Sequence, residues 1–134
     1  MIYLVLYLFQ DILLFNRSFF ENITYGNENY NKEKLNFLIK KLNLTTLIEK
    51  NGMEFIINSN NSNLSGGEKR RICLLRTLLK DSNLYILDEP TSEIDCESSK
   101  SIIEYIYSLR KDKTVIVFTH DSQFDIYADN IFVL

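Results

Sequence analysis

Three short polar clusters each follow an apolar run, and in an open parallel sheet ligands bind beyond the carboxyl ends of the strands. In chain order the clusters are Gln10-Asp11, Asp88-Glu89 and His120. Adjacent carboxylates at a buried strand end repel each other and are costly to desolvate, and a divalent cation removes that cost. Mg²⁺ is usually held by one or two carboxylates together with substrate phosphates. The clusters therefore predict a site where one carboxylate holds a metal, another orients water and a histidine contacts a γ-phosphate.

A Ser-Gly-Gly segment at 65–67 adds a second chemical feature. Ser65 is expected to cap a helix over 66–80, and with Glu68 it forms an S-x-x-E capping box. Two glycines near a helix start are unfavourable unless something needs close access to the backbone. Free N–H groups and the positive end of the helix dipole favour an anion there. Taken alone, each of these features is more often structural, and the basic run at 69–71 is expected to be a solvated helix face.

The apolar pattern predicts alternating strands and helices. Helices are expected over 31–50, 66–80 and 97–110, and strands over 1–9, 84–87, 114–119 and 131–134. A turn is expected near 16–18 and a loop over the Asn- and Ser-rich residues 58–63. The alternation from residue 84 onward indicates βαβ units, hence an α/β protein with a parallel sheet.

Composition narrows the class of protein. The chain has 134 residues, of which 46% are hydrophobic and 25% charged, as in a single globular domain. A net charge of −3 does not indicate a nucleic-acid partner. Cys73 and Cys96 form no C-x-x-C pair and are expected to be reduced thiols. The apolar start has no basic region and is too short to span a bilayer.

Five segments, taken together and in order, resemble the ABC-type ATPase family. They are YLFQD at 7–11, LSGGEKRR at 64–71, YILDEP at 85–90, SEID at 92–95 and VIVFTH at 115–120. In that order they are similar to the family's Q-loop, signature motif, Walker B strand, D-loop and switch histidine. The resemblance covers essentially the whole chain. It implies an α/β fold, a partial P-loop NTPase domain with a parallel sheet core and a helical subdomain.

The segment FQDILLFNRSFFENITYGN at 9–27 resembles exporter-type members in particular. The stretch that leads into LSGGE also resembles those exporters, although the family often carries an acidic residue where this chain has Asn58-Ser59-Asn60. The resemblance implies that residues 1–134 are a partial ATPase domain. Within it, 11–80 would form the helical subdomain that carries the signature, and 1–10 with 84–134 would form the remainder of the core.

The resemblance also implies a role for each matching residue. Asp88 would hold Mg²⁺ through water, with Gln10 sensing metal and water and coupling them to the membrane domain. Glu89 would be the general base, and His120 would contact the γ-phosphate of ATP. The signature motif would close over ATP that is held by a partner domain. Two further residues would lie at the interface of that dimer. These residues are Ser65, Gly66, Gly67 and Glu68 in the signature, and Ser92 and Asp95 at the interface.

No phosphate-binding loop of the form G-x-x-x-x-G-K-[ST] occurs in the 134 residues. In the family this loop lies upstream of the Q-loop and supplies most of the grip on the phosphates. The chain alone is therefore expected to bind ATP weakly or not at all, and to be a fragment, a truncated gene product or one piece of a split domain. Without upstream strands, its sheet is expected to have an unpaired apolar edge.

These features lead to three functional hypotheses. The first is a nucleotide-binding subunit or fragment of an exporter, which uses ATP and Mg²⁺. It would pair head-to-tail with a second ATP-binding domain and dock on a transmembrane domain at the cytoplasmic face of the membrane. The second is a non-catalytic module that docks on a membrane domain or an intact ATPase. The third is a soluble ABC ATPase of DNA repair or translation, which the segment 9–27 and the mildly acidic charge disfavour.

Overall fold

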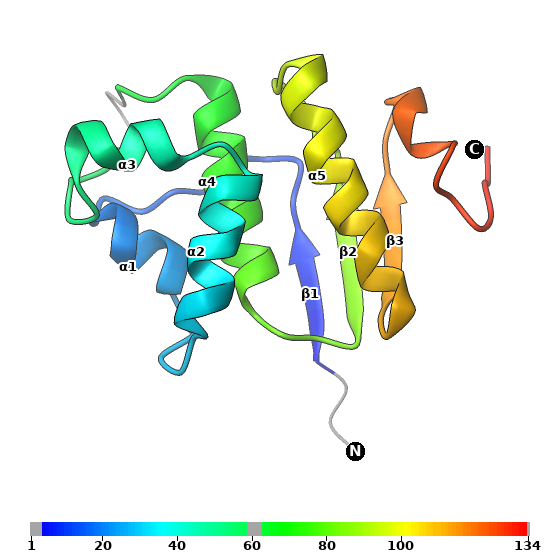
Figure 1. Ribbon diagram of the computed structural model, residues 1–134, viewed down its shortest axis with the longest axis horizontal. Coiled ribbons are helices and arrows are strands. Elements are labelled where there is room, and N and C mark those ends of the chain that lie inside the picture. The colour runs from blue at the N-terminus through cyan, green and yellow to red at the C-terminus, as the bar shows by residue number, and fades with distance from the viewer. Residues whose placement is uncertain (1–3, 59–62, 134) are drawn as a thin grey trace.

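A three-stranded parallel sheet forms the centre of the protein. The computed structural model describes residues 4–58 and 63–133 (Figure 1). Strands β1 (Val5–Leu8), β2 (Leu84–Asp88) and β3 (Thr114–Phe118) lie in the order β1-β2-β3. Their register aligns Tyr7 with Ile86 and Ile86 with Ile116. The predicted α/β class and parallel sheet are confirmed.

The expected strand at 131–134 is wrong as far as it can be followed. Residues 131–133 form no strand, and Leu134 lies outside the described residues. Phe132 and Val133 are 86% and 94% exposed, and the segment curves away from β3 (Figure 1). A strand needs a neighbour to satisfy its backbone groups, and this segment has none within the described chain.

Two long helices flank the sheet. Helix α5 (Cys96–Ser108) lies across one face and buries Ile102, Ile103 and Ile106. Helix α4 (Gly66–Leu79) lies beside β1 and buries nine of its residues. Short 3₁₀ turns follow at Leu109–Lys111 and Ser122–Phe124. The helices predicted over 66–80 and 97–110 are therefore confirmed to within two residues at each end.

Three smaller helices fill the other side of α4. They are α1 (Phe19–Thr24), α2 (Lys32–Lys41) and α3 (Thr45–Asn51). Helix α1 was not predicted and begins directly after the turn expected near 16–18, with Ser18 as its N-cap. Of the loop expected at 58–63, residues 59–62 lie outside the described residues.

The single helix expected over 31–50 is wrong, because the chain breaks between α2 and α3. Leu42 and Leu44 are 1% and 0% exposed. In one continuous helix, residues i and i+2 point to different sides, so both leucines could not enter the same core. Asn43 takes a left-handed φ of 52°, which turns the chain so that both leucines enter the core. The core then runs as one hydrophobic cluster from the sheet into α1, α2 and α4.

Candidate functional site

Glu89 lies directly beyond the carboxyl end of β2 and is held by the end of β3. Its backbone N–H donates to the carbonyl of Phe118 at 2.8 Å. One carboxylate oxygen, Oε1, accepts from the His120 N–H at 3.1 Å, and Oε2 accepts from the Thr119 hydroxyl at 3.3 Å. Glu89 also has a positive φ of 47°, an unfavourable conformation for a glutamate that the surrounding contacts must maintain. The side chain is only 19% exposed, so these contacts fix the direction of a mostly shielded carboxylate.

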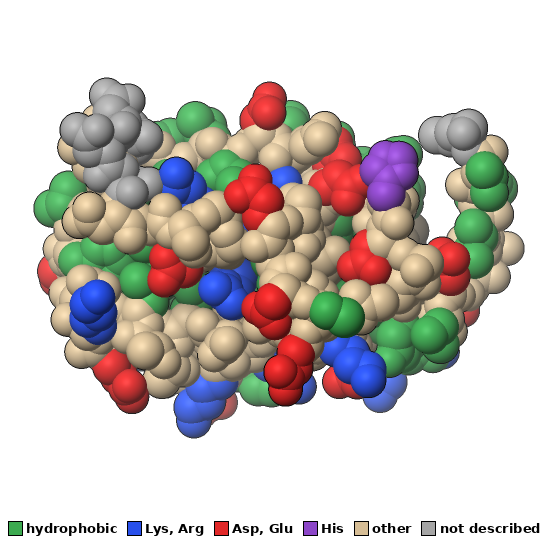
Figure 2. Space-filling view, turned by 90° about the horizontal axis from the view of Figure 1, so that it is seen from above, with side chains coloured by type: hydrophobic (Ala, Val, Ile, Leu, Met, Phe, Trp, Pro, Cys, Tyr) green, Lys and Arg blue, Asp and Glu red, His purple; other side chains and the backbone are tan. Residues whose placement is uncertain are grey.

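His120 places its imidazole over the same carboxylate. Its Nε2 lies 3.8 Å from Glu89 Oε1, and the imidazole is fully exposed. Figure 2, which looks down on this edge of the sheet, shows the histidine beside a group of acidic side chains. The turn that carries His120 is tied to the turn after β2, because the Thr91 hydroxyl donates to Asp121 at 2.9 Å. The structure therefore brings the predicted base and the predicted histidine together.

Asp88 ends β2, and its carboxylate has one weak contact, with the Tyr7 hydroxyl at 3.5 Å. No group of three or more histidine, cysteine, aspartate or glutamate side chains gathers as a metal cage in the part of the chain that the structure describes. Mg²⁺ needs only one or two carboxylates when substrate phosphates supply the other ligands. The donor set around Asp88 therefore fits an ion that arrives with a nucleotide.

Gln10 lies just beyond β1, with an exposed side chain. The backbone carbonyl of Gln10 accepts a hydrogen bond from Arg70 Nη2 at 2.6 Å, and the backbone carbonyl of Phe9 accepts one from Arg70 Nη1 at 2.8 Å. Arg70 Nε donates to the Ser92 hydroxyl at 3.0 Å. Arg70 is only 2% exposed, so the expected solvated face over 69–71 is wrong at its central residue. One guanidinium group thus joins the segments that hold Gln10, the signature helix and the turn after β2.

The signature segment begins α4 as predicted. The Glu68 N–H donates to the Ser65 hydroxyl at 3.1 Å, and the Ser65 N–H donates to the Glu68 carboxylate at 2.7 Å, which confirms the capping box. Glu93 lies against the two glycines, with a left-handed φ of 62°. A Cβ added to Gly66 would overlap the Glu93 carboxylate, and one added to Gly67 would lie 2.6 Å from the Glu93 carbonyl oxygen. Gly67 is therefore needed for a close contact with the backbone of this chain, whereas Gly66 meets only the flexible Glu93 side chain.

Asp95 caps the next helix, α5. Its carboxylate accepts from the Ser98 N–H at 2.8 Å, and this hydrogen bond holds the pKa of Asp95 below its usual value. Ser92 lies three residues before Asp95, and its hydroxyl accepts a hydrogen bond from Arg70 Nε. Both residues lie on the turn between β2 and α5, which is where the sequence placed them.

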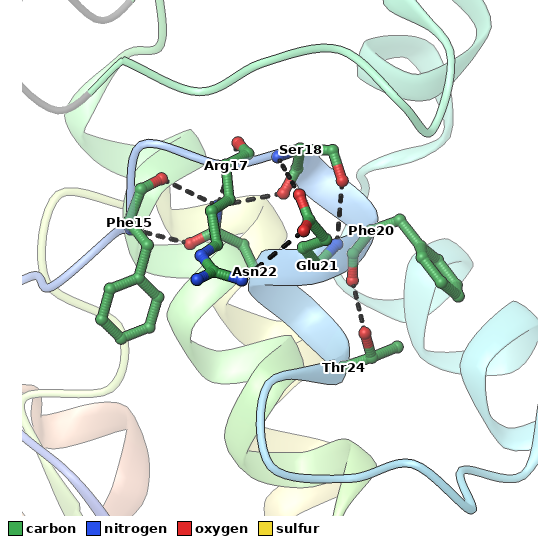
Figure 3. A network of polar contacts seen from close by, with 7 residues as sticks. All are labelled: Phe15, Arg17, Ser18, Phe20, Glu21, Asn22 and Thr24. Atoms are coloured by element: carbon green, nitrogen blue, oxygen red, sulfur yellow. Dashed lines mark hydrogen bonds and ion pairs between the residues drawn. The ribbon is translucent and has the colours of Figure 1, made fainter.

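The segment from Phe9 to Asn27 is held in place by Asn22 and Arg76. The fully buried Asn22 amide donates to the carbonyls of Phe15 and Ser18, each at 3.0 Å (Figure 3). Arg76 donates to the Asn22 carbonyl at 2.7 Å and to the Leu13 carbonyl at 2.8 Å. Desolvation of this guanidinium lowers the pKa of Arg76. Neither residue was singled out from the sequence, although Asn22 lies within the exporter-like phrase at 9–27.

Comparison with known proteins decides the family. The family model described as "ABC transporter" matches residues 4–92, which is most of the chain and includes β1, the signature helix and β2. The chain belongs to the ABC transporter family.

Curated ABC relatives cover nearly the whole chain. An ATP-dependent lipid A-core flippase from Pectobacterium atrosepticum is 38% identical over 128 residues, which is 93% of this chain and 22% of that protein. The flippase from Neisseria meningitidis serogroup B is 35% identical over 127 residues, 93% of this chain and 20% of that protein. The chain thus spans about a fifth of the length of these relatives. It corresponds to part of an exporter-type ABC ATP-binding domain.

A solved ABC exporter has the same fold. The structure titled "Structure of a bacterial Atm1-family ABC exporter with ATP bound" gives a TM-score of 0.80 at 25% identity, over 90% of this chain and 22% of that one. The predicted class, a partial ABC ATPase fold, is therefore confirmed. Membership also implies nucleotide binding with Mg²⁺ for the family in general. Within the described residues, no helix is long and apolar enough to cross a membrane.

Proposed function

We propose that this chain is a nucleotide-binding part of an ABC exporter, in which ATP binding and hydrolysis drive transport across a membrane. The observation that carries the proposal is the pairing of Glu89 with His120 at the carboxyl edge of the sheet, next to Asp88. The same chain carries the signature helix, held to this edge through Arg70. The flippases that match 93% of the chain support transport as the purpose of the hydrolysis.

The contacts of Glu89 support the following proposed roles at the carboxyl edge. Asp88 would hold Mg²⁺ through water, and Gln10, at the end of the neighbouring strand, would sense metal and water. When bound, the ion would neutralise charge on the phosphates. The Glu89 carboxylate, aimed by Thr119 and the His120 N–H, would accept a proton from the attacking water. The exposed imidazole of His120 would donate to the γ-phosphate.

The signature would act on a nucleotide held by a second ATP-binding domain in a head-to-tail pair. Ser65, Gly66 and Gly67 begin α4, where backbone N–H groups favour an anion. Ser92 and Asp95 would lie at the contact between the two domains. A transmembrane domain is the proposed membrane partner, with the chain at the cytoplasmic face.

A substitution of the proposed base tests this function. In the protein expressed from its own gene and purified with its membrane partners, Glu89→Gln should lower ATP turnover about 100-fold or more while ATP binding is retained. Glu104→Gln, an exposed glutamate of α5, is the matched control and should leave turnover unchanged. Unchanged turnover in Glu89→Gln would remove Glu89 from the role of general base.

A second candidate is a non-catalytic module that docks on a membrane domain or an intact ATPase. It is favoured by the lack of a G-x-x-x-x-G-K-[ST] segment in the 134 residues. The same preparation separates the two functions. If the unsubstituted protein co-purifies with a membrane domain but the complex does not hydrolyse ATP, the docking role replaces the catalytic one.

A further inference from the structure

The turn between β2 and α5 rests on the start of the signature helix. Figure 1 shows that α4 and α5 both begin at the carboxyl edge of the sheet. The Ser92 N–H donates to the Glu89 carbonyl at 3.1 Å, and the Ser92 hydroxyl accepts from Arg70 of α4 at 3.0 Å. The next residue is Glu93, whose carbonyl oxygen would lie 2.6 Å from a Cβ on Gly67. The backbone of Glu93 is therefore in close contact with the first turn of α4.

The side chain of Glu93 lies over the same helix start. A Cβ on Gly66 would overlap the Glu93 carboxylate and would lie 2.7 Å from its carbon, Cδ. The carboxylate thus occupies the space that a side chain at position 66 would fill. Within the described residues this carboxylate accepts no hydrogen bond and forms no ion pair, and Glu93 is an exposed residue. A change of rotamer alone can therefore move it away.

The place that the carboxylate occupies favours negative charge. The N–H groups of Gly66 and Gly67 are among the first four of α4, which have no acceptor within the helix. The positive end of the helix dipole adds to this preference. A hollow of about 340 Å³ opens at the same place, lined in part by Gly66, Lys69 and Glu93. Glu93 is thus the anion that the chain itself supplies to the start of its signature helix.

We propose that Glu93 is an autoinhibitory residue of the signature, whose carboxylate occupies the place of a nucleotide phosphate and has to leave before that phosphate can approach. The inference rests on the proposed function, in which Gly66 and Gly67 act on a nucleotide held by a second ATP-binding domain. Two negative groups at one helix start repel each other, so the carboxylate and the phosphate exclude one another. The apparent affinity for nucleotide is then reduced by the fraction of molecules in which the start of α4 is free.

A variant that removes the charge and keeps the shape tests the inference. The protein expressed from its own gene is purified with its membrane partners and dialysed against Mg²⁺ and the non-hydrolysable β,γ-imido analogue of ATP. Glu93→Gln should lower the Kd for the analogue about tenfold, a typical coupling between two such sites. Glu104→Gln removes the same charge from an exposed position of α5, so its Kd should equal that of the unsubstituted protein.

An unchanged Kd in Glu93→Gln overturns the inference. Weaker binding overturns it as well, because Glu93 would then help to hold the nucleotide or its metal. Glu93→Ala also removes the side-chain atoms over Gly66, and it should bind at least as tightly as Glu93→Gln. If only Glu93→Ala binds more tightly, the obstacle is the volume of the side chain and not its charge, and the proposal fails. If no variant binds the analogue, there is no phosphate for Glu93 to exclude, and the proposal fails too.

Turnover is measured separately, with ATP, on the same preparations. A protein that binds the analogue more tightly after Glu93→Gln but hydrolyses no ATP upholds the autoinhibitory contact and overturns the proposed hydrolysis. A protein that hydrolyses ATP but has the same Kd with and without the Glu93 charge does the opposite. The failure of the inference and the failure of the proposed function are therefore distinguishable.

Discussion

At the scale of single residues, Arg70 holds the site together. Its guanidinium group donates to the carbonyls of Phe9 and Gln10 and to the Ser92 hydroxyl, and the side chain is 2% exposed. Arg70→Met is expected to lower the free energy of unfolding by about 3 kcal/mol, because three part-buried acceptors lose a charged donor at once. Urea denaturation of the purified chain measures this loss.

The control for Arg70→Met removes the same charge elsewhere. Lys100→Met, at an exposed position of α5, should change the free energy of unfolding by less than about 0.5 kcal/mol. If the two variants lose equal stability, the effect of Arg70 is one of net charge and not of its hydrogen bonds.

Tyr85 gives the chain a stability change at high pH. The side chain is 1% exposed, its hydroxyl donates to the Lys80 carbonyl at 2.9 Å, and burial raises its pKa from 10.0 to about 12. The folded-state pKa lies above the unfolded value, so this contribution to stability is complete below pH 10 and is lost as the pH rises through 12. We expect the unfolding free energy to fall more steeply over this range in the natural protein than in Tyr85→Phe.

Difference titration supplies the check on Tyr85. Phenolate absorbance of the folded protein should show a step near pH 12 that is missing from Tyr85→Phe. Tyr25→Phe, which changes a tyrosine that is 51% exposed, should keep that step. A Tyr85→Phe variant that retains the step would assign it to another group.

At the scale of elements, the start of α4 is fitted to the turn after β2. A Cβ on Gly67 would lie 2.6 Å from a backbone oxygen of Glu93, which cannot move alone, whereas a Cβ on Gly66 meets the end of the flexible Glu93 side chain. Alanine favours a helix over glycine by about 1 kcal/mol, but a backbone clash costs about 1–3 kcal/mol. Gly67→Ala is therefore expected to lower the unfolding free energy by about 1 kcal/mol, and Gly66→Ala to leave it nearly unchanged.

A double-mutant comparison distinguishes the two glycines. Adding Glu93→Ala should remove any cost of Gly66→Ala, and it should not rescue Gly67→Ala, since the carbonyl remains. Thermal unfolding of the four variants measures this difference. Rescue of both variants would mean that the backbone of Glu93 is free to shift.

Elements whose signals are local were predictable from the sequence. The capping box of Ser65 and Glu68 needs only residues three apart, and it is confirmed. The break at Asn43 was missed, because periodicity marks Leu42 and Leu44 as apolar without showing that both enter one core. The expected strand at 131–134 failed at 131–133 for a related reason, since a strand depends on a neighbour and none pairs with these three residues in the described part of the chain.

The candidate site was likewise predictable where its signals are local in the sequence, and not where they depend on tertiary contacts. The motifs placed Asp88, Glu89 and His120 at strand ends, and the parallel sheet brings Glu89 and His120 into contact. Arg70 and Glu93 were not recognised as part of the site, because their partners are 22 or more residues away in the sequence. The run at 69–71 has the composition of a solvated face, and only tertiary contacts show that its central residue is buried.

At the scale of the whole molecule, the chain carries the residues proposed to act on a nucleotide but not a loop that grips phosphates. Asp88, Glu89 and His120 gather at one edge, whereas no G-x-x-x-x-G-K-[ST] occurs in the 134 residues. In proteins that have this loop, its backbone N–H groups and its lysine supply most of the affinity for the β- and γ-phosphates. A polypeptide of residues 1–134 alone should therefore bind ATP with a Kd above about 1 mM, a free energy weaker than about −4 kcal/mol.

Equilibrium dialysis with Mg²⁺ and ATP measures this affinity, with the complete ATP-binding domain of the Pectobacterium atrosepticum flippase as the positive control. Weak binding by residues 1–134 beside tight binding by the control is the expected result. Micromolar binding by residues 1–134 would mean that the carboxyl edge and the start of α4 hold the phosphates unaided. Arg70→Met would then be the informative variant: it loosens the link between α4 and the strand ends, so it should weaken that binding if both elements contact one nucleotide.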